Sequence, residues 1–113
     1  MKRVALITLG CAALMMAATP VLAQDAKVKK GAEVFVTAKC TKCHSIAGKG
    51  NAKGKLDEVG SKLTPAEIKS WLETPDDMAA KAKETRKPVM KKTPLSKDDE
   101  DALIAYLSTL KKK

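Results

Sequence analysis

Two cysteines and the only histidine of the chain lie within one run of five residues, Cys40-Thr41-Lys42-Cys43-His44. Two thiols at this spacing can add to the two vinyl groups on neighbouring edges of one porphyrin, and the histidine that follows can bind the iron. The CxxCH pattern is the signature of c-type haem attachment. We therefore predict one covalently attached haem c, with Cys40 and Cys43 as its tethers and His44 as an iron ligand.

Three other uses of these side chains fit the sequence less well. A thioredoxin-like redox pair needs a βαβ context, which the sequence pattern does not offer. A tetrahedral zinc site needs four ligands, and Cys40, Cys43 and His44 supply at most three. A disulfide between Cys40 and Cys43 would close a very short loop and stabilise the fold little. Haem attachment uses both thiols at once and is the favoured interpretation.

Residues 1–23 have the pattern of a secretory signal, with a basic start, an apolar run over residues 4–18 and a small-residue cleavage site that ends at Ala23. The apolar run is shorter than the roughly 20 residues that span a bilayer as a helix. We predict cleavage after Ala23 and a soluble, periplasmic domain over residues 24–113, without an integral membrane span. An uncleaved N-terminal anchor, or lipidation at Cys11, is the weaker alternative.

The composition limits what the predicted 90-residue domain can be. The whole chain has a formal net charge of +9, and its only aromatic residues are Phe35, Trp71 and Tyr106. A core this small buries little surface and usually needs a disulfide, a metal or a cofactor to remain folded. These properties exclude a multidomain enzyme and a transmembrane transporter. Nucleic-acid binding is disfavoured despite the charge, because the protein is expected to be exported and no aromatic residues alternate with its lysines.

Helical patterns dominate the rest of the sequence, and no period-2 run of β-branched residues interrupts them, so the predicted class is all-α. Thr64-Pro65-Ala66-Glu67 is a capping box that begins one helix, and Thr74-Pro75 ends it. Ser96 is the expected N-cap of the last helix, which continues to Lys111–Lys113. The other two expected helices cover residues 26–38 and 76–84. Loops are predicted over the Gly- and Lys-rich residues 45–61 and over the proline-containing residues 85–94.

On these residues the chain resembles the class I, single-haem cytochrome c family over nearly all of its predicted mature part. Gly31 and Phe35 match the glycine and the aromatic of the family's first helix, and Leu103 and Tyr106 match the leucine and tyrosine of its last helix. The resemblance implies a small fold of three to four helices wrapped around one haem c. It also implies that the first and last helices cross at Gly31, where Leu103 and Tyr106 pack against it.

The resemblance further implies a methionine as the sixth iron ligand, on an extended loop a few residues before the last helix. Met90 has this position, whereas the alternative, Met78, falls in an expected helix. The chain departs from the family where a proline usually supplies the carbonyl that orients the axial histidine. Gly54 and Lys55 occupy that place, and a carbonyl of either could orient His44. Trp71 could donate to a haem propionate, with core packing as an equal alternative.

The function implied by the resemblance is that of an electron carrier and not an enzyme: a one-electron shuttle with a His44/Met90-ligated haem. The alternative is a haem protein with an open or labile sixth site, suited to gas sensing or to peroxidase-type reactions. The carrier would act as a monomer or as a subunit beside an oxidase, a dehydrogenase or another respiratory complex. An acidic docking surface on that partner would meet the basic residues Lys42, Arg86, Lys87, Lys91 and Lys92, unless these only solvate the protein.

Overall fold

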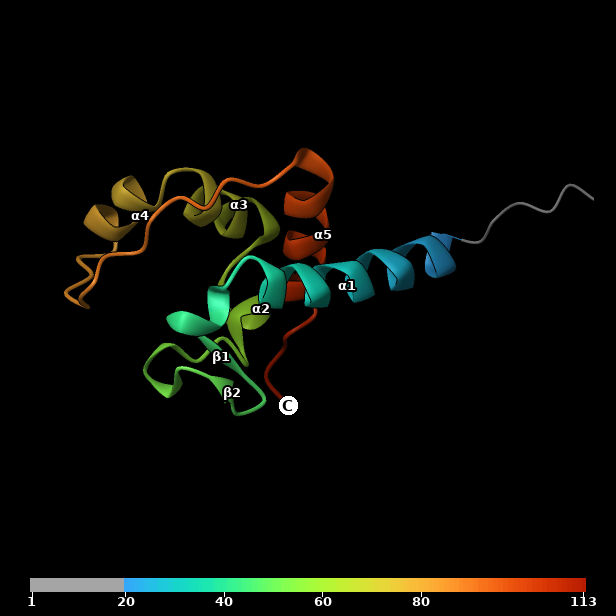
Figure 1. Cartoon of the computed structure of the whole chain (residues 1–113), viewed down its shortest axis with the longest axis horizontal. Coiled ribbons are helices and arrows are strands. Elements are labelled where there is room, and N and C mark those ends of the chain that lie inside the picture. The colour runs from blue at the N-terminus through green and yellow to red at the C-terminus, as the bar shows by residue number, and fades with distance from the viewer. Residues whose placement is uncertain (1–19) are drawn as a thin grey trace, which may run out of the picture.

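The computed structural model describes residues 20–113, so most of the predicted secretory signal lies outside the described residues. Within them, no helix combines the length and the apolar character needed to cross a membrane. The elements in chain order are α1 (Pro20–Thr37), η1 (Cys40–Lys42), β1 (Ser45–Ile46), β2 (Lys49–Gly50), η2 (Ala52–Gly54), α2 (Val59–Lys62), α3 (Pro65–Glu73), α4 (Pro75–Lys81) and α5 (Lys97–Ser108) (Figure 1).

The most extensive contact between two elements is the crossing of α1 and α5, seen in Figure 1 where the blue-to-cyan helix passes the red one. Gly31 is buried there, and a Cβ on it would collide with the carbonyl oxygen of Ala102 and the Cβ of Tyr106. The rings of Phe35 and Tyr106 meet edge to face, with centroids 6.5 Å apart. The predicted close approach at Gly31 is confirmed. Tyr106 lies against Gly31 as expected, but the second residue in contact is Ala102 and not Leu103.

The core lies beneath this crossing and draws on four helices. Leu103 of α5 is only 1% exposed, and Ile68 of α3 is 2% exposed. Full burial of a side chain of this size contributes about 1.5–3 kcal/mol, so these positions hold α3 and α5 together. The buried cluster consists of Val34, Phe35, Val59, Ile68, Leu103 and Leu107.

Both predicted helix caps are present. The backbone N–H of Glu67 donates to the Thr64 hydroxyl at 3.2 Å, and the Thr64 N–H donates back to the Glu67 carboxylate at 3.1 Å. The Ser96 hydroxyl accepts from the N–H of Asp99 at 3.2 Å. Each cap satisfies an N–H group that the helix itself leaves without a partner, so the starts of α3 and α5 follow from local sequence.

The start of the first helix and the end of the last helix differ most from the sequence prediction. The first helix already includes Pro20, well before Ala26, because residues 21–30 contain neither glycine nor a further proline, and proline suits a first turn. The last helix ends at Ser108 instead of continuing to Lys111–Lys113. The tail then turns toward α2, where Lys111 Nζ donates to the carbonyl of Gly60 at 2.6 Å. The N–H of Lys112 also donates to the Ser61 hydroxyl at 2.6 Å, so the tail is held against α2.

The predicted loop over residues 45–61 contains more structure than expected. Strands β1 and β2 pair antiparallel through a two-residue turn, and the one-turn helix α2 follows η2. Both turn residues, Ala47 and Gly48, have positive φ (52° and 77°), as a type I′ hairpin requires. Alanine is an unusual residue at such a position, so the sequence gives only a weak hairpin signal. The strands are two residues long, and the all-α class is confirmed.

Candidate functional site

The CxxCH run forms a tight turn that carries its side chains close together. Within it, the N–H groups of Cys43 and His44 donate to the carbonyl of Cys40 at 3.1 and 2.9 Å. Cys40 and Cys43 are half-buried free thiols. Burial raises the pKa of the Cys40 thiol, so it is protonated at neutral pH. The turn therefore presents two thiols and an imidazole in one small region.

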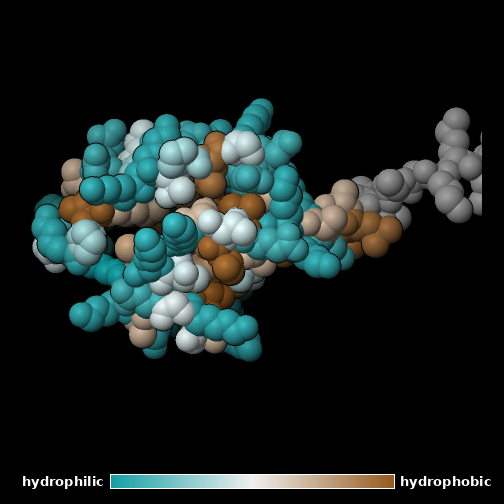
Figure 2. All heavy atoms as spheres, viewed as in Figure 1, coloured by the Kyte–Doolittle hydropathy of each residue, from teal (hydrophilic) through white to brown (hydrophobic). Residues whose placement is uncertain are grey.

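This region opens on a cavity of about 360 Å³, within the size range of cofactor sites. Figure 2 shows a hollow on this face, with brown and tan apolar atoms between teal hydrophilic rims. The cavity brings together all four residues predicted for the site, Cys40, Cys43, His44 and Met90. Its apolar wall includes Phe35, Leu56, Val59, Leu63, Ile68, Trp71, Leu72, Leu103 and Leu107.

The ring of His44 is oriented by a backbone carbonyl. Its Nδ1 lies 3.1 Å from the carbonyl oxygen of Gly54, one of the two positions expected to provide this contact. A carbonyl can only accept, so Nδ1 carries the proton and Nε2 keeps a free lone pair. Burial lowers the pKa of His44 and outweighs the Gly54 hydrogen bond, which acts in the opposite direction. The imidazole is thus neutral, as a metal ligand must be.

Asn51 stabilises the loop that carries Gly54, in a part of the chain where the family's usual proline is replaced. Its backbone N–H is shared between the carbonyls of Thr41 and His44, at 3.1 Å each, and its side-chain amide donates to the carbonyl of Lys42 at 3.1 Å. The N–H of Gly54 in turn donates to the carbonyl of Asn51 at 3.1 Å. Sequence reasoning missed Asn51, although asparagine in a Gly-rich loop is a known turn signal.

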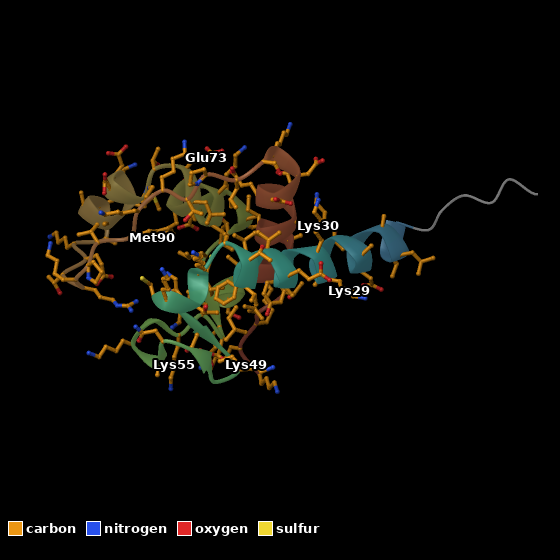
Figure 3. The ribbon with its side chains drawn as sticks, viewed as in Figure 1. Lys29, Lys30, Lys49, Lys55, Glu73 and Met90 are labelled. Atoms are coloured by element: carbon orange, nitrogen blue, oxygen red, sulfur yellow. The ribbon has the colours of Figure 1, made fainter. Side chains whose placement is uncertain are left out.

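The two candidate methionines lie in different surroundings. Met90 is half-buried and lines the cavity, on the segment between α4 and α5 that has no regular structure (Figure 3). Met78 belongs to α4, and its neighbour Ala79, not Met78 itself, lines the cavity. Trp71 is half-buried and forms part of the cavity wall.

Arg86 is the second residue whose role the sequence did not reveal. Its Nη2 donates to the carbonyl oxygen of Cys43 at 2.6 Å, and its side chain is half-buried at the cavity wall. The sequence placed it among the charges that meet a partner. The other residues of that group, Lys42, Lys87, Lys91 and Lys92, are exposed.

The donor set fits a covalently attached haem. It combines two free thiols at the CxxCH spacing, a neutral imidazole with a free Nε2, a thioether and an apolar wall. Across residues 20–113, no three His, Cys, Asp or Glu side chains gather in the manner of a metal-ion site.

Comparison with protein families finds that the model described as Cytochrome c matches residues 28–111. The matched region contains the CxxCH turn, the cavity and the crossing of α1 and α5. Neither the curated proteins nor the solved structures include a match to this chain.

Proposed function

The chain belongs to the cytochrome c family, and on that premise we propose that it is a one-electron carrier with a His44/Met90-ligated haem c. The family itself implies a haem-based electron-transfer role and a covalently bound haem. The observation that carries the finer proposal is the gathering of Cys40, Cys43, His44 and Met90 around one apolar cavity. When bound, the haem supplies an iron that accepts one electron from a reduced partner and passes it to an oxidised one.

The protein's own residues define what this site does. Cys40 and Cys43 tether the group at two points, and the Gly54 carbonyl holds His44 in one orientation. The apolar wall excludes water and favours the less charged, reduced state of the site. A thioether from Met90 donates weakly, which raises the reduction potential, and it fills the position at which an external molecule would bind. Transfer of electrons without bond chemistry is the activity that remains.

Met90 is the proposed sixth ligand because it is the cavity-lining methionine of the two. The absorption spectrum of the purified holoprotein tests this assignment through the near-infrared sulfur-to-iron band. Met90→Ala should abolish the band, lower the potential and allow the ferrous protein to bind carbon monoxide. Met78→Ala is the matched control and should leave all three properties unchanged.

A wild-type protein that lacks this band and binds carbon monoxide readily would contradict the carrier proposal. The open or labile sixth site, with gas sensing or peroxidase-type chemistry, would then describe the protein. Loss of the band in Met78→Ala but not in Met90→Ala would keep the carrier function and change the ligand.

Export to the periplasm is part of the proposal and rests on residues 1–23. Val21 and Leu22 at the start of α1 are 67% and 68% exposed, so their removal would uncover no core. The intact mass of the protein isolated from its native compartment tests this step. A chain that begins at Gln24 supports cleavage after Ala23, and a chain that retains the leader contradicts it.

We also propose that exposed lysines near Met90 attract an acidic redox partner. Lys91 and Lys92 follow Met90 directly, whereas Lys29 lies on α1, away from Met90 in Figure 3. Oxidation of the reduced protein by ferricyanide, an anionic probe, should slow as salt increases. Replacing Lys91 and Lys92 by Gln should slow it more than replacing Lys27 and Lys29. Equal effects of the two double variants would show that net charge alone matters.

A further inference from the structure

Arg86 connects the segment that carries Met90 with the turn that carries His44. Its guanidinium Nη2 donates to the carbonyl oxygen of Cys43 at 2.6 Å, between residues that are 43 positions apart in the sequence. Met90 follows only a few residues later on the same irregular segment. This hydrogen bond therefore joins the two walls of the cavity that carry the proposed iron ligands.

The same guanidinium also packs against the residue that orients His44. A Cβ on Gly54 would collide with Nη1 of Arg86 and with the carbonyl of Cys43, and it would lie 2.9 Å from Nδ1 of His44. Only glycine leaves room for this approach. Arg86, Cys43, Gly54 and His44 thus meet at one point beside the cavity.

The partner of the half-buried Arg86 guanidinium is a backbone carbonyl and not a carboxylate. The ion pairs among residues 20–113 are Lys30 with Asp99 and Lys69 with Glu73, and neither involves Arg86. The nearby Glu84 carboxylate accepts from the backbone N–H of Arg86, at 3.2 Å, and not from its guanidinium. A half-buried cation is costly unless hydrogen bonds stabilise it, and here the Cys43 carbonyl serves as the acceptor.

We propose that Arg86 is a positioning residue that ties the Met90 segment to the CxxCH turn and so resists displacement of Met90 by other ligands. The inference rests on the proposed His44/Met90 ligation. An external ligand can replace Met90 only if the segment moves, and that movement strains or breaks the charge-assisted hydrogen bond. The positive charge at the cavity wall also favours the reduced, less positive form of the site.

Imidazole titration of the ferric holoprotein tests directly whether the Arg86–Cys43 hydrogen bond resists displacement of Met90. Arg86→Gln should bind imidazole about threefold to thirtyfold more tightly than wild type, because displacement no longer breaks a hydrogen bond from a charged donor. Its reduction potential should also fall. Arg86→Lys retains the charge but loses the planar fork, so its imidazole affinity should lie between the two.

Lys87→Gln is the matched control, since it removes one positive charge at the neighbouring, exposed position. It should bind imidazole within about twofold of wild type, as expected for a surface change. If Lys87→Gln and Arg86→Gln have the same imidazole affinity, the effect comes from net charge, and the proposed role of the Arg86–Cys43 hydrogen bond is refuted. If Arg86→Gln does not form a folded holoprotein, the imidazole affinity of Arg86→Lys is compared with that of Lys87→Gln instead.

The wild-type spectrum separates this inference from the proposed function. A wild-type protein with the near-infrared band, together with unchanged imidazole affinity in Arg86→Gln and Arg86→Lys, refutes the tie alone. A wild-type protein without the band refutes the Met90 ligation and the tie together.

Discussion

The crossing of α1 with α5 and the irregular residues 82–96 both border the cavity, but they are built in opposite ways. At the crossing, Gly31 allows two helix backbones to touch, and Phe35 and Tyr106 extend the contact with their rings. The segment that carries Met90 has no regular structure, and Arg86 joins it to the CxxCH turn through one side-chain hydrogen bond.

This difference suggests separate roles for the two regions: the crossing controls the stability of the fold, and the Met90 segment controls the replacement of Met90 by other ligands. The crossing is an extended apolar contact, which contributes to the stability of the whole fold. A single charge-assisted hydrogen bond contributes little to global stability but can control a local opening of the chain. We therefore expect changes at the crossing to unfold the protein and changes near Arg86 to alter the site while the fold persists.

The largest expected effect is at Gly31. Gly31→Val should lower the free energy of unfolding by about 3 kcal/mol, because its side chain would collide with the backbone of Ala102, which cannot move without shifting α5. Chemical denaturation of the holoprotein measures the change. Val36→Ala, at a position on the same helix that is 62% exposed, should stay within about 0.5 kcal/mol of wild type. Equal stability of Gly31→Val and wild type would mean that the helices do not touch at this point.

A smaller change in stability, with a larger change in the site, is expected at Gly54. Gly54→Ala should cost about 1–3 kcal/mol, because the added methyl group crowds Cys43, Arg86 and the ring of His44. It should also shift the reduction potential and the haem spectrum, since the carbonyl that orients His44 must move.

Gly48→Ala is the control for this prediction. Gly48 has a positive φ of 77° but no atom within 4 Å of an added Cβ, so alanine there strains the hairpin turn without touching the site. The variant should lose stability and retain the wild-type potential. A normal potential and spectrum in Gly54→Ala would show that the Gly54 carbonyl does not control His44.

The two regions also differ in how far sequence reasoning could reach. The caps at Thr64 and Ser96 were predicted because the groups that form them lie within one helical turn. The close approach at Gly31 was expected from the resemblance and is confirmed. The contact of Arg86 with Cys43 was missed because it spans 43 positions, and no local pattern specifies which distant carbonyl a side chain will meet.

The hairpin shows the same limit at shorter range. Its turn uses Ala47 and Gly48, and an alanine with positive φ has no sequence signal comparable to Asn-Gly. The Gly- and Lys-rich composition of the segment correctly indicated an irregular surface region. It could not indicate that Asn51 would hold the segment against the CxxCH turn, since that role depends on carbonyls freed by the turn's own fold.

The smallest expected effect concerns the contact of α5 with α3, at the first turn of α5. Oε1 of Glu100 is shielded from solvent and has no hydrogen-bond partner among the described residues. Burial, and then the neighbouring Glu73 carboxylate, raise the pKa of Glu100. A carboxyl whose pKa is higher in the folded than in the unfolded state stabilises the fold below the unfolded value, near 4.5, and loses that contribution as the pH rises through the folded value.

Glu100→Gln should therefore increase the free energy of unfolding at pH 7, because the folded state disfavours the ionised form of Glu100. The gain should be less than about 1 kcal/mol because solvent screens this pair near the surface. It should shrink as the pH falls through the raised folded pKa of Glu100 and should be gone below about 4.5, where Glu100 is protonated in both states. Denaturation of the two proteins between pH 4 and 7 measures the difference, with Glu33→Gln on the exposed side of α1 as the control for net charge. A pH-independent gain would mean that the negative charge of Glu100, buried beside the Glu73 carboxylate, is not what destabilises this contact between α5 and α3.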